Sequence, residues 1–452
     1  MKRLLTFALT ILLLLAPAQP AFAQQGLGRE PGMQIHSHAV YLFSLDEQTV
    51  VYQRNADTPL YPASLVKIMT AILAIENTPD LRTLVTYPAY VQNYLFDYQV
   101  RYGVSISLAG MRAGEQLPMS SLLHAIMLQS GNEAAMTIAD YVGEGSQQRF
   151  VEMMNDRAAQ LGATNTNFTN PTGLPDPEMV TTARDMAIIA RHAIDLPGFM
   201  DIASAASYTA GPTNLSPRLE WGTTITMQVP GNALFYPYLR GVKTGTTPQA
   251  GRNFISTASR DGLRYLLIVM NAPFADPETG VQFPVNYAFA DTRNIYDWAF
   301  DTFRIMPLIE RGRRIHEVPL RLNANQDFLP LEAGERFSAL MARDTDLGEN
   351  VTMIFEVPDW VRAPVSQGEH IGYVRLLLYG REVGRTELLA AETIGASRHL
   401  LLLDRAGEIM SSFWFIFWVI FFVLLIVAYT GLMIVRNRNR RRRGGFRPRR
   451  RL

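Results

Sequence analysis

The sequence predicts two folded domains, an α/β domain and then a small all-β sandwich, followed by a helix that crosses a membrane. Between residues 36 and 313, short β-rich runs alternate with long amphipathic helical patterns, whereas between 315 and 394 only short alternating runs occur. Residues 413–435 are apolar and carry no charge. A chain of 452 residues is long enough for two domains.

Two kinds of local pattern predict the elements of the α/β domain. Short β-rich runs bounded by turn residues predict strands; these are 39–43 and 50–52, which form a hairpin, then 254–256 and 265–270. Apolar residues at helical spacing predict helices; these are 120–129, 133–142 and two that begin after the capping residues Ser146 and Thr182. In the all-β domain, residues 374–379 and 383–386 predict a hairpin, and Pro and Gly divide the remainder into short strands.

The N-terminus has the order of an exported signal peptide. A basic start is followed by the apolar residues 4–16 and by Ala21-Phe22-Ala23, so cleavage is expected before Gln24. The alternative is an uncleaved anchor. It is less favoured because the apolar run is short for a span and prolines interrupt its end.

The C-terminus carries a stronger membrane signal. The 23 residues of 413–435 span roughly 34 Å as a helix, enough to cross a hydrocarbon core of roughly 30 Å. Aromatic residues crowd its start, and ten arginines follow within 436–452. This pattern predicts a single-pass protein of the cytoplasmic membrane, with its main domain on the extracytoplasmic (periplasmic) side and a basic cytoplasmic tail. A nucleic-acid-binding tail is the rival interpretation, but a polybasic stretch directly after a span more often sets topology.

Charge and cysteine content limit the possible functions. The chain has no cysteine, which excludes disulfides, cysteine nucleophiles and thiolate metal sites. The formal net charge is +1, but without Lys2, Arg3 and the ten tail arginines it is −11, with 30 basic and 41 acidic residues. An acidic body gives no indication of nucleic-acid binding. No HExxH motif occurs, so a metallopeptidase is not expected, and neither a metal nor a cofactor is predicted.

The domain organisation that follows has six parts. They are a signal peptide (1–23), a catalytic domain (24–312), a β-sandwich (313–395), a linker (396–412), a transmembrane helix (413–435) and a basic tail (436–452).

The first chemical motif is Ser-Leu-Val-Lys at 64–67. Apolar residues follow Ser64 at helical spacing, so the serine is predicted at the positive end of a buried helix, with Lys67 on the same face. To accept a proton from Ser64, Lys67 must be neutral near pH 7, which requires a pKa about three units below its usual 10.4. Burial and a neighbouring cation can lower it. Taken alone, the pattern is better explained by an N-cap serine and a solvated lysine.

Two further motifs follow in order. Ser130-Gly131-Asn132 lies between two predicted helices, where a helix break capped by Asn132 is the simpler interpretation. Lys243-Thr244-Gly245 precedes a predicted strand, and alone it fits an exposed strand end. With an SxxK serine upstream, Ser130 can relay a proton, Asn132 can hold a substrate backbone, and Lys243 and Thr244 can bind a carboxylate. The ordered triple is the pattern of serine β-lactamases and penicillin-binding proteins.

The chain resembles the low-molecular-mass penicillin-binding proteins that act as serine-type D-alanyl-D-alanine carboxypeptidases, the peptidase S11 family. Four segments carry the resemblance: 61–67 (YPASLVK), 129–134 (QSGNEA), 168–174 (FTNPTGL) and 241–245 (GVKTG). Residues 364–368 and 376–384 look like the C-terminal β-sandwich of that family. The resemblance implies a catalytic domain of the serine β-lactamase and DD-peptidase fold, an antiparallel sheet with helices on both sides.

The resemblance also implies a role for each motif residue. Ser64 would be the acylated nucleophile, Lys67 its general base, and Ser130 and Lys243 the proton and charge network. The substrate would be contacted by Asn132, Lys243, Thr244, Gly245 and Thr246, with the N–H groups of Ser64 and Thr246 as the oxyanion hole. The implied substrate is the D-Ala-D-Ala end of peptidoglycan stem peptides. Penicillin and other β-lactams would inhibit by acylating the same serine.

Two departures from the family pattern stand out. Family members usually carry an arginine after the strand that follows KTG, where it binds the terminal carboxylate. Here Arg264 precedes that strand and no arginine occurs at 265–292, so this contact is unassigned. The family also commonly ends in an amphipathic helix lying on the membrane, whereas this chain ends in a span and an arginine tail.

Other functions fit the same motifs less well. A class A β-lactamase needs a glutamate that activates the deacylating water, commonly in an ExxLN motif. Here Glu152-Met153-Met154-Asn155 matches that motif only in part. An endopeptidase acting on crosslinks uses the same motifs, but the sandwich and tether favour a carboxypeptidase. A membrane-tethered penicillin-binding scaffold without turnover is the alternative from another class; the intact motif residues argue against it.

Overall fold

The computed structural model describes residues 27–443 and divides the chain into two compact units. The first contains the residues up to Ile305 together with Leu340–Asp344, and the second contains Met306–Ala339 and the residues from Thr345 onward. The predicted signal peptide at 1–23 and the end of the basic tail lie outside the described residues.

A five-stranded antiparallel sheet forms the centre of the first unit. Its strand order is β2 (Thr49–Arg54), β1 (Ala39–Ser44), β9 (Leu263–Ala272), β8 (Gly251–Arg260) and β7 (Leu239–Thr247). The hairpin predicted at 39–52 is confirmed as β1 and β2, and the later strands as β8 and β9. The motif strand β7 is at one edge, so one side of its backbone is free of strand partners within this sheet.

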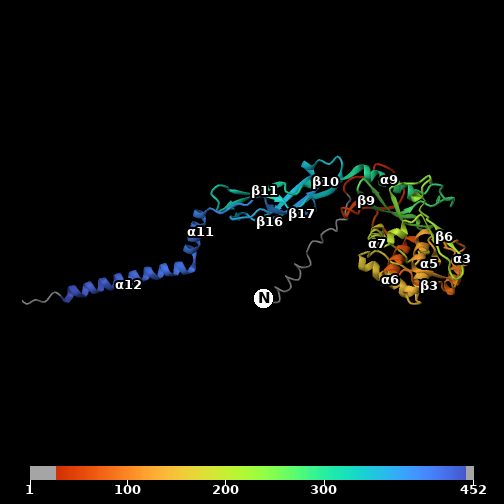
Figure 1. The fold of residues 1–452 in the computed structure, drawn as a ribbon, viewed down its shortest axis with the longest axis horizontal. Helices are drawn as coiled ribbons and strands as arrows, with labels where there is room; N and C mark the ends of the chain where they lie inside the picture. Colours follow the sequence, from red (N-terminus) through yellow and green to blue (C-terminus); the bar gives the residue numbers. More distant parts are fainter. Residues whose placement is uncertain (1–26, 444–452) are drawn as a thin grey trace, which may run out of the picture. The chain divides into compact units, whose positions relative to one another are not determined.

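Residues alternate between the two faces of this sheet, as the period of two in a strand requires. Tyr41 and Phe43 of β1 join a core formed with helices on one side, whereas Val40 and Leu42 join a core on the opposite side. Both faces are therefore buried. Figure 1 shows α7, α6 and α5 on one side of the sheet and α9 on the other, the predicted arrangement of helices on both sides.

The helices of the first unit start and end where the sequence places capping residues. The side chain of Ser146 accepts from the N–H of Arg149, that of Thr182 accepts from Asp185, and Gly162 closes its helix in the left-handed region. The helices are η1 (Ala63–Val66), α2 (Lys67–Asn77), α3 (Ala89–Tyr102), α4 (Met119–Leu128), α5 (Asn132–Val142), α6 (Gln147–Leu161), α7 (Ala183–Asp195), α8 (Phe199–Ala203), η2 (Thr226–Gln228) and α9 (Tyr287–Thr302). Two small antiparallel sheets complete the unit: β3 (Leu84–Thr86) with β4 (Gln116–Pro118), and β5 (Ser207–Ala210) with β6 (Leu219–Gly222).

The second unit is built around strands, as predicted. Its six-stranded sheet has the order β14 (Val351–Glu356), β16 (His370–Leu378), β17 (Arg381–Ala390), β12 (Phe328–Ala333), β11 (Arg314–Arg321) and β15 (Val361–Arg362). The predicted hairpin is confirmed as β16 and β17, and alternate residues of its strands, such as Val374 and Leu376, are fully buried. The short helix α10 (Leu347–Asn350) precedes β14, and β10 (Phe303–Ile309) pairs with β13 (Phe337–Ala342) in a two-stranded sheet.

Two helices end the described chain. They are α11 (Arg398–Ser411) and α12 (Phe413–Arg443). The part of α12 from Phe413 to Asn439 is long and apolar enough to cross a membrane, and none of its most apolar window is buried against protein. An apolar surface of this size is stable where lipid covers it, which fits membrane anchoring.

Candidate active site

Ser64 lies on the single turn η1, directly before α2. The preceding residue, Ala63, has φ +48°, a left-handed conformation that costs a residue with a Cβ roughly 1–3 kcal/mol. Ala63 and Leu65 are buried, while the Ser64 side chain is half-buried and accessible. The surrounding structure therefore fixes the turn and presents one hydroxyl.

Lys67, the first residue of α2, points back at this hydroxyl. Its Nζ lies 3.1 Å from Ser64 Oγ, and it donates to Asn132 Oδ1 at 2.8 Å and to the carbonyl of Thr172 at 2.5 Å. The side chain is fully buried. All of these partners are neutral, so no carboxylate forms an ion pair with Lys67 among the residues that the structure describes.

Burial and a second cation lower the pKa of Lys67. Burial is the larger cause, and the charge of Lys243 acts in the same direction; together they hold the pKa well below its usual value, against a smaller opposing effect of Glu133. Burial also lowers the pKa of Lys243, to about 7. Burial thus favours the neutral form of both lysines relative to an exposed lysine.

The second motif forms the connection between α4 and α5. Ser130 has φ +58°, and its buried Oγ has no hydrogen-bond partner among the described residues. Asn132 begins α5 and is held by its own N–H, which donates to the carbonyl of Ser107 at 3.0 Å. A buried hydroxyl without a partner costs free energy, and a substrate group that bonds to Ser130 Oγ would remove that cost.

Glu133 directly follows this motif, and the sequence predicted no role for it. Its Oε1 accepts from the N–H groups of Ala109, Gly110 and Met111, at 2.6, 2.9 and 3.4 Å. Burial raises the pKa of Glu133, and the backbone N–H groups act against that rise. Glu133 thus holds the segment around Ala109 against α5, next to the Ser107 carbonyl that fixes Asn132.

The third motif lies within β7. Lys243 is fully buried, and its Nζ donates to the carbonyl of Thr244 at 3.1 Å. The hydroxyls of Thr244 and Thr224 are 2.8 Å apart. Gly245 passes so close to the serine turn that a Cβ there would lie 2.9 Å from the carbonyl oxygen of Pro62 and 3.2 Å from the N of Ser64. A side chain at Gly245 would push the edge strand away from the serine.

Two residues outside the three motifs hold the serine turn in place. Asn253 of β8 donates to the carbonyls of Tyr61 and Pro62, at 2.9 and 3.1 Å. Asn170 accepts from the N–H groups of Thr172 and Gly173, and so shapes the loop whose Thr172 carbonyl receives Lys67. The sequence offered the loop of Asn170 only as part of a resemblance, and none of the three motifs contains Asn253.

Gly173 offers a test of how closely this loop packs on the serine turn. A Cβ at Gly173 would lie 2.0 Å from the carbonyl oxygen of Ala63, and φ there is +79°. We expect Gly173→Ala to displace the turn and slow acylation of Ser64 by labelled penicillin at least about 100-fold, because a shift of about 1 Å in a reacting group has an effect of that order.

Gly162 provides the matched control. It also has positive φ, +92°, but open space surrounds its Cβ position. Gly162→Ala should lower the free energy of unfolding by about 1 kcal/mol and leave acylation unchanged. Equal acylation rates for the two variants would show that contact with Ala63 does not position the serine.

Ser64 opens into a polar pocket of 350 Å³. Hydroxyl and amide side chains dominate its lining, together with one guanidinium group. The lining residues are Ser64, Ser107, Ser130, Thr224, Thr226, Thr244, Thr246, Arg252, Asn253, Asn286, Ala288 and Phe289. The structure thus brings four of the predicted site residues, Ser64, Ser130, Thr244 and Thr246, to one pocket. Lys67, Asn132, Lys243 and Gly245 do not line it, but the contacts above place Lys67 and Asn132 directly behind Ser64.

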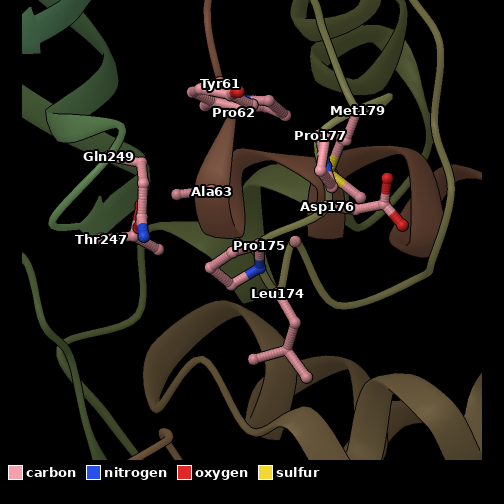
Figure 2. A pocket seen from close by; sticks show the side chains of 11 residues that line it. Tyr61, Pro62, Ala63, Leu174, Pro175, Asp176, Pro177, Met179, Thr247 and Gln249 are labelled. Carbon is pink, nitrogen blue, oxygen red and sulfur yellow. The ribbon is translucent and has the colours of Figure 1, made fainter. Parts of the chain in front are cut away.

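A second, smaller hollow of 150 Å³ is lined by Tyr61, Pro62 and Ala63, which directly precede Ser64. Figure 2 shows its walls: the proline-rich loop after Gly173 lies opposite Tyr61 and Pro62, and the β7–β8 turn lies beside Ala63. Ser64 does not line this hollow. It is more apolar than the pocket that contains the serine hydroxyl, because Pro62, Leu174, Pro175, Pro177 and Met179 contribute to it.

The residues of the partial ExxLN pattern, a disfavoured alternative in the sequence analysis, have structural contacts. Glu152 is exposed on α6 and accepts from Gln148, while the amide of Asn155 bonds to the backbone of Phe168 at both its oxygen and nitrogen. The partial lactamase motif therefore stabilises a helix and a loop. Within residues 27–443, no group of three or more His, Asp or Glu side chains is arranged to hold a metal ion.

The fold and the geometry around Ser64 define this chain as a serine hydrolase of the fold class that contains the DD-peptidases and serine β-lactamases. The peptidase S11 family, D-alanyl-D-alanine carboxypeptidase, matches residues 25–274, which is more than half of the chain. The chain belongs to this family.

Curated relatives and solved structures agree with this assignment. The chain is 26% identical over 409 residues to the D-alanyl-D-alanine carboxypeptidase DacF of Bacillus subtilis, covering 90% of this chain and 98% of the relative. It is 31% identical over 228 residues to DacB2 of Mycobacterium tuberculosis, covering 50% and 72%. Penicillin-binding protein 5 from Haemophilus influenzae has a similar structure, with a TM-score of 0.58 and 26% identity over 81% of this chain and all of that chain. The Streptomyces K15 DD-transpeptidase matches 59% of this chain and 98% of its own, with a TM-score of 0.52 and 26% identity.

Proposed function

We propose that the protein is a serine-type D-alanyl-D-alanine carboxypeptidase that removes the terminal D-alanine from peptidoglycan stem pentapeptides. The observation that carries the proposal is the position of Lys67. Its Nζ is 3.1 Å from Ser64 Oγ, and burial beside a second lysine lowers its pKa, so it can be neutral at the pH at which it must accept a proton.

The chemistry runs through an ester on Ser64. Neutral Lys67 takes the hydroxyl proton as Oγ attacks the carbonyl carbon of the penultimate D-alanine. The C–N bond then breaks, and the proton taken up by Lys67 passes to the leaving amine of the terminal D-alanine through Ser130, whose Oγ has no other partner among the described residues. Lys67 is then neutral again. Water attacks the ester and gives a proton to Lys67, which returns it to the departing Oγ, so the shortened peptide leaves with Ser64 restored.

Two backbone N–H groups are suited to stabilise the oxyanion. Gly245 has no side chain, so β7 lies against the serine turn and carries Thr246 with it. We assign the N–H groups of Ser64 and Thr246 to the oxyanion hole, where such donors act on the charge that develops in the transition state. Asn132, Thr244 and Gly245 are assigned to binding of the substrate backbone and carboxylate, with Lys243 as a further member of the same network.

The organisation of the chain supports a location beside peptidoglycan. We propose that residues 24–312 form the catalytic domain and 313–395 a β-sandwich, with 396–412 linking them to the membrane helix. The apolar part of α12 is followed by arginines, which favours a cytoplasmic end for that helix and an extracytoplasmic position for Ser64. Penicillin, as an acylating analogue of D-Ala-D-Ala, is proposed to inhibit at Ser64.

Release of free D-alanine tests the proposal. The full chain, purified in detergent, is incubated with a stem pentapeptide, and free D-alanine is measured over time; we expect stoichiometric release of one D-alanine per peptide. A crosslinked muropeptide dimer and a fluorescent penicillin serve as parallel substrates. Cleavage of the dimer alone would instead support an endopeptidase, covalent labelling without any turnover a scaffold, and rapid penicillin hydrolysis a lactamase.

A further inference from the structure

We propose that Arg252 binds the terminal carboxylate of the substrate. The inference rests on the proposed function, because a carboxypeptidase must recognise the free carboxylate next to the bond that it cuts. The sequence left this contact unassigned: Arg264 lies elsewhere and bonds to Asp46, and no arginine occurs at 265–292. Among the described residues, Arg252 is the one arginine that lines the pocket of Ser64.

The sheet register places Arg252 beside the motif strand. Arg252 of β8 is the direct partner of Thr246 in β7. Residues directly opposite in an antiparallel pair lie on the same face, and Thr244, two residues before Thr246, shares that face. All three line the pocket that contains Ser64 and Ser130. The guanidinium group and two threonine hydroxyls therefore face one space, a combination that suits a carboxylate.

Neutral groups hold the guanidinium in place. Its two terminal nitrogens donate to the carbonyls of Val285 and Phe283, at 2.5 and 3.1 Å, and its Cζ lies 5.5 Å from the centre of the Phe274 ring. Within residues 27–443, no Asp or Glu oxygen lies within 4.0 Å of it. An arginine has five N–H donors, so donors remain for a ligand, and the half-buried charge is not neutralised by the protein.

The lysines of the site are poorly suited to supply this charge alone. The pKa of Lys243 is lowered to about 7 and that of Lys67 lies well below its usual value, so both lose charge across the pH range in which Lys67 can act as a base. The guanidinium of Arg252 stays charged throughout. The two tasks therefore fall to different residues: Arg252 supplies a permanent positive charge for the carboxylate, and Lys67 supplies a neutral amine for the serine.

The test compares two substrates that differ only at the carboxylate. The full chain and the variant Arg252→Gln are assayed on a stem pentapeptide ending in a free carboxylate and on its C-terminal amide. For the variant, kcat/KM on the carboxylate should fall roughly 10- to 150-fold, mainly through KM, as expected for loss of a hydrogen-bonded charge partner. On the amide it should change less than about threefold, and Arg252→Lys should retain part of the preference.

Arg240→Gln is the matched control. Arg240 is exposed on β7, six residues before Thr246 and so roughly 20 Å away along the strand, and this variant should keep the wild-type preference. Equal losses on carboxylate and amide in Arg252→Gln would overturn the proposal, since they would indicate a strand displaced by the loss of the carbonyl contacts. No loss on either substrate would also overturn it.

The acylation rates with penicillin and penicillin methyl ester make the test independent of peptidase turnover. If the wild-type chain releases no D-alanine, the proposed function fails, but selective loss of penicillin acylation over methyl ester acylation still supports Arg252 as the carboxylate-binding group. If the wild-type chain releases D-alanine and the variant keeps its preference for the free acid in both assays, the function stands and the assignment of Arg252 is wrong.

Discussion

Replacing Ser64 with alanine is expected to abolish covalent labelling by fluorescent penicillin and to lower D-alanine release at least about 10⁴-fold. The reason is that the ester forms on this oxygen: without it, Lys67 has no hydroxyl to deprotonate and the reaction loses its two-step path. Labelling is read by gel fluorescence of the full chain in detergent, and D-alanine release by a coupled assay on the same preparation.

Two controls separate chemistry from folding in this experiment. Ser64 is only half-buried, so Ser64→Ala should change the free energy of unfolding by less than about 1 kcal/mol. Ser107 lines the same pocket, but the Lys67 amine donates to Ser64, Asn132 and Thr172 and not to Ser107, so Ser107→Ala should still be labelled covalently. Persistent labelling of Ser64→Ala, or its loss in Ser107→Ala alone, would show that the wrong serine was named.

Local patterns were sufficient to predict much of the fold. The alternation at 39–43 places Tyr41 and Phe43 on one face and Val40 and Leu42 on the other, and the structure buries both sets against different helices. Ser146 and Thr182 cap their helices as their spacing predicted. These features depend on neighbours within a few residues, and such information is present in the sequence itself.

Long-range pairing could not be predicted in the same way. The order β2-β1-β9-β8-β7 places strands from the start of the first unit beside strands more than 200 residues later, and no local pattern specifies that order. Residues Leu340–Asp344 belong to the first unit although the chain around them belongs to the second. Side-chain periodicity carries no information about such a return of the chain.

In the site, too, contacts within a motif could be predicted from the sequence, whereas contacts between distant segments could not. The motifs predicted that Ser64 and Lys67 would lie on one face, since Lys67 is the third residue after Ser64, and the two side chains are in contact. Asn253 and Arg252 were missed because no motif contains their partners: Asn253 donates to the Pro62 carbonyl of the distant serine turn, and Arg252 meets Thr246 through the β7–β8 register. A polar pair, Arg-Asn, at the start of an otherwise apolar predicted strand was the one available signal.

The surroundings of the two lysines explain how Lys67 can act as a base. Both are fully buried without a carboxylate partner among the described residues, and burial lowers the pKa of each. The charge of Lys243 lowers the pKa of Lys67 further, while that of Glu133 raises it. The protonation of Lys67 is therefore set by three identifiable causes, and each can be changed separately.

Acylation by penicillin is accordingly expected to slow as the pH falls through the pKa of Lys67, because protonation removes the base. The midpoint should lie well below the 10.4 of an ordinary lysine, since burial and Lys243 favour the neutral form. Lys67→Arg should lose about 10²- to 10⁴-fold at every pH and show no such limb, because arginine keeps its proton in proteins. The rate constant is measured by stopped-flow fluorescence between pH 5 and 10, taken as roughly the range bracketing these groups.

Two further variants, which shift the pKa of Lys67 in opposite directions, test whether Lys67 acts as a base or only as a fixed positive charge. Lys243→Met removes the charge that lowers the pKa of Lys67, so the limb should move to higher pH; Glu133→Gln removes the charge that raises it, so the limb should move to lower pH. If these two substitutions only damaged the site, the acylation rate of each variant would fall, but the pH midpoints of their profiles would not move in opposite directions. A Lys67→Arg variant that keeps wild-type acylation would mean that Lys67 acts by its charge, and the proton of Ser64 would then need another acceptor.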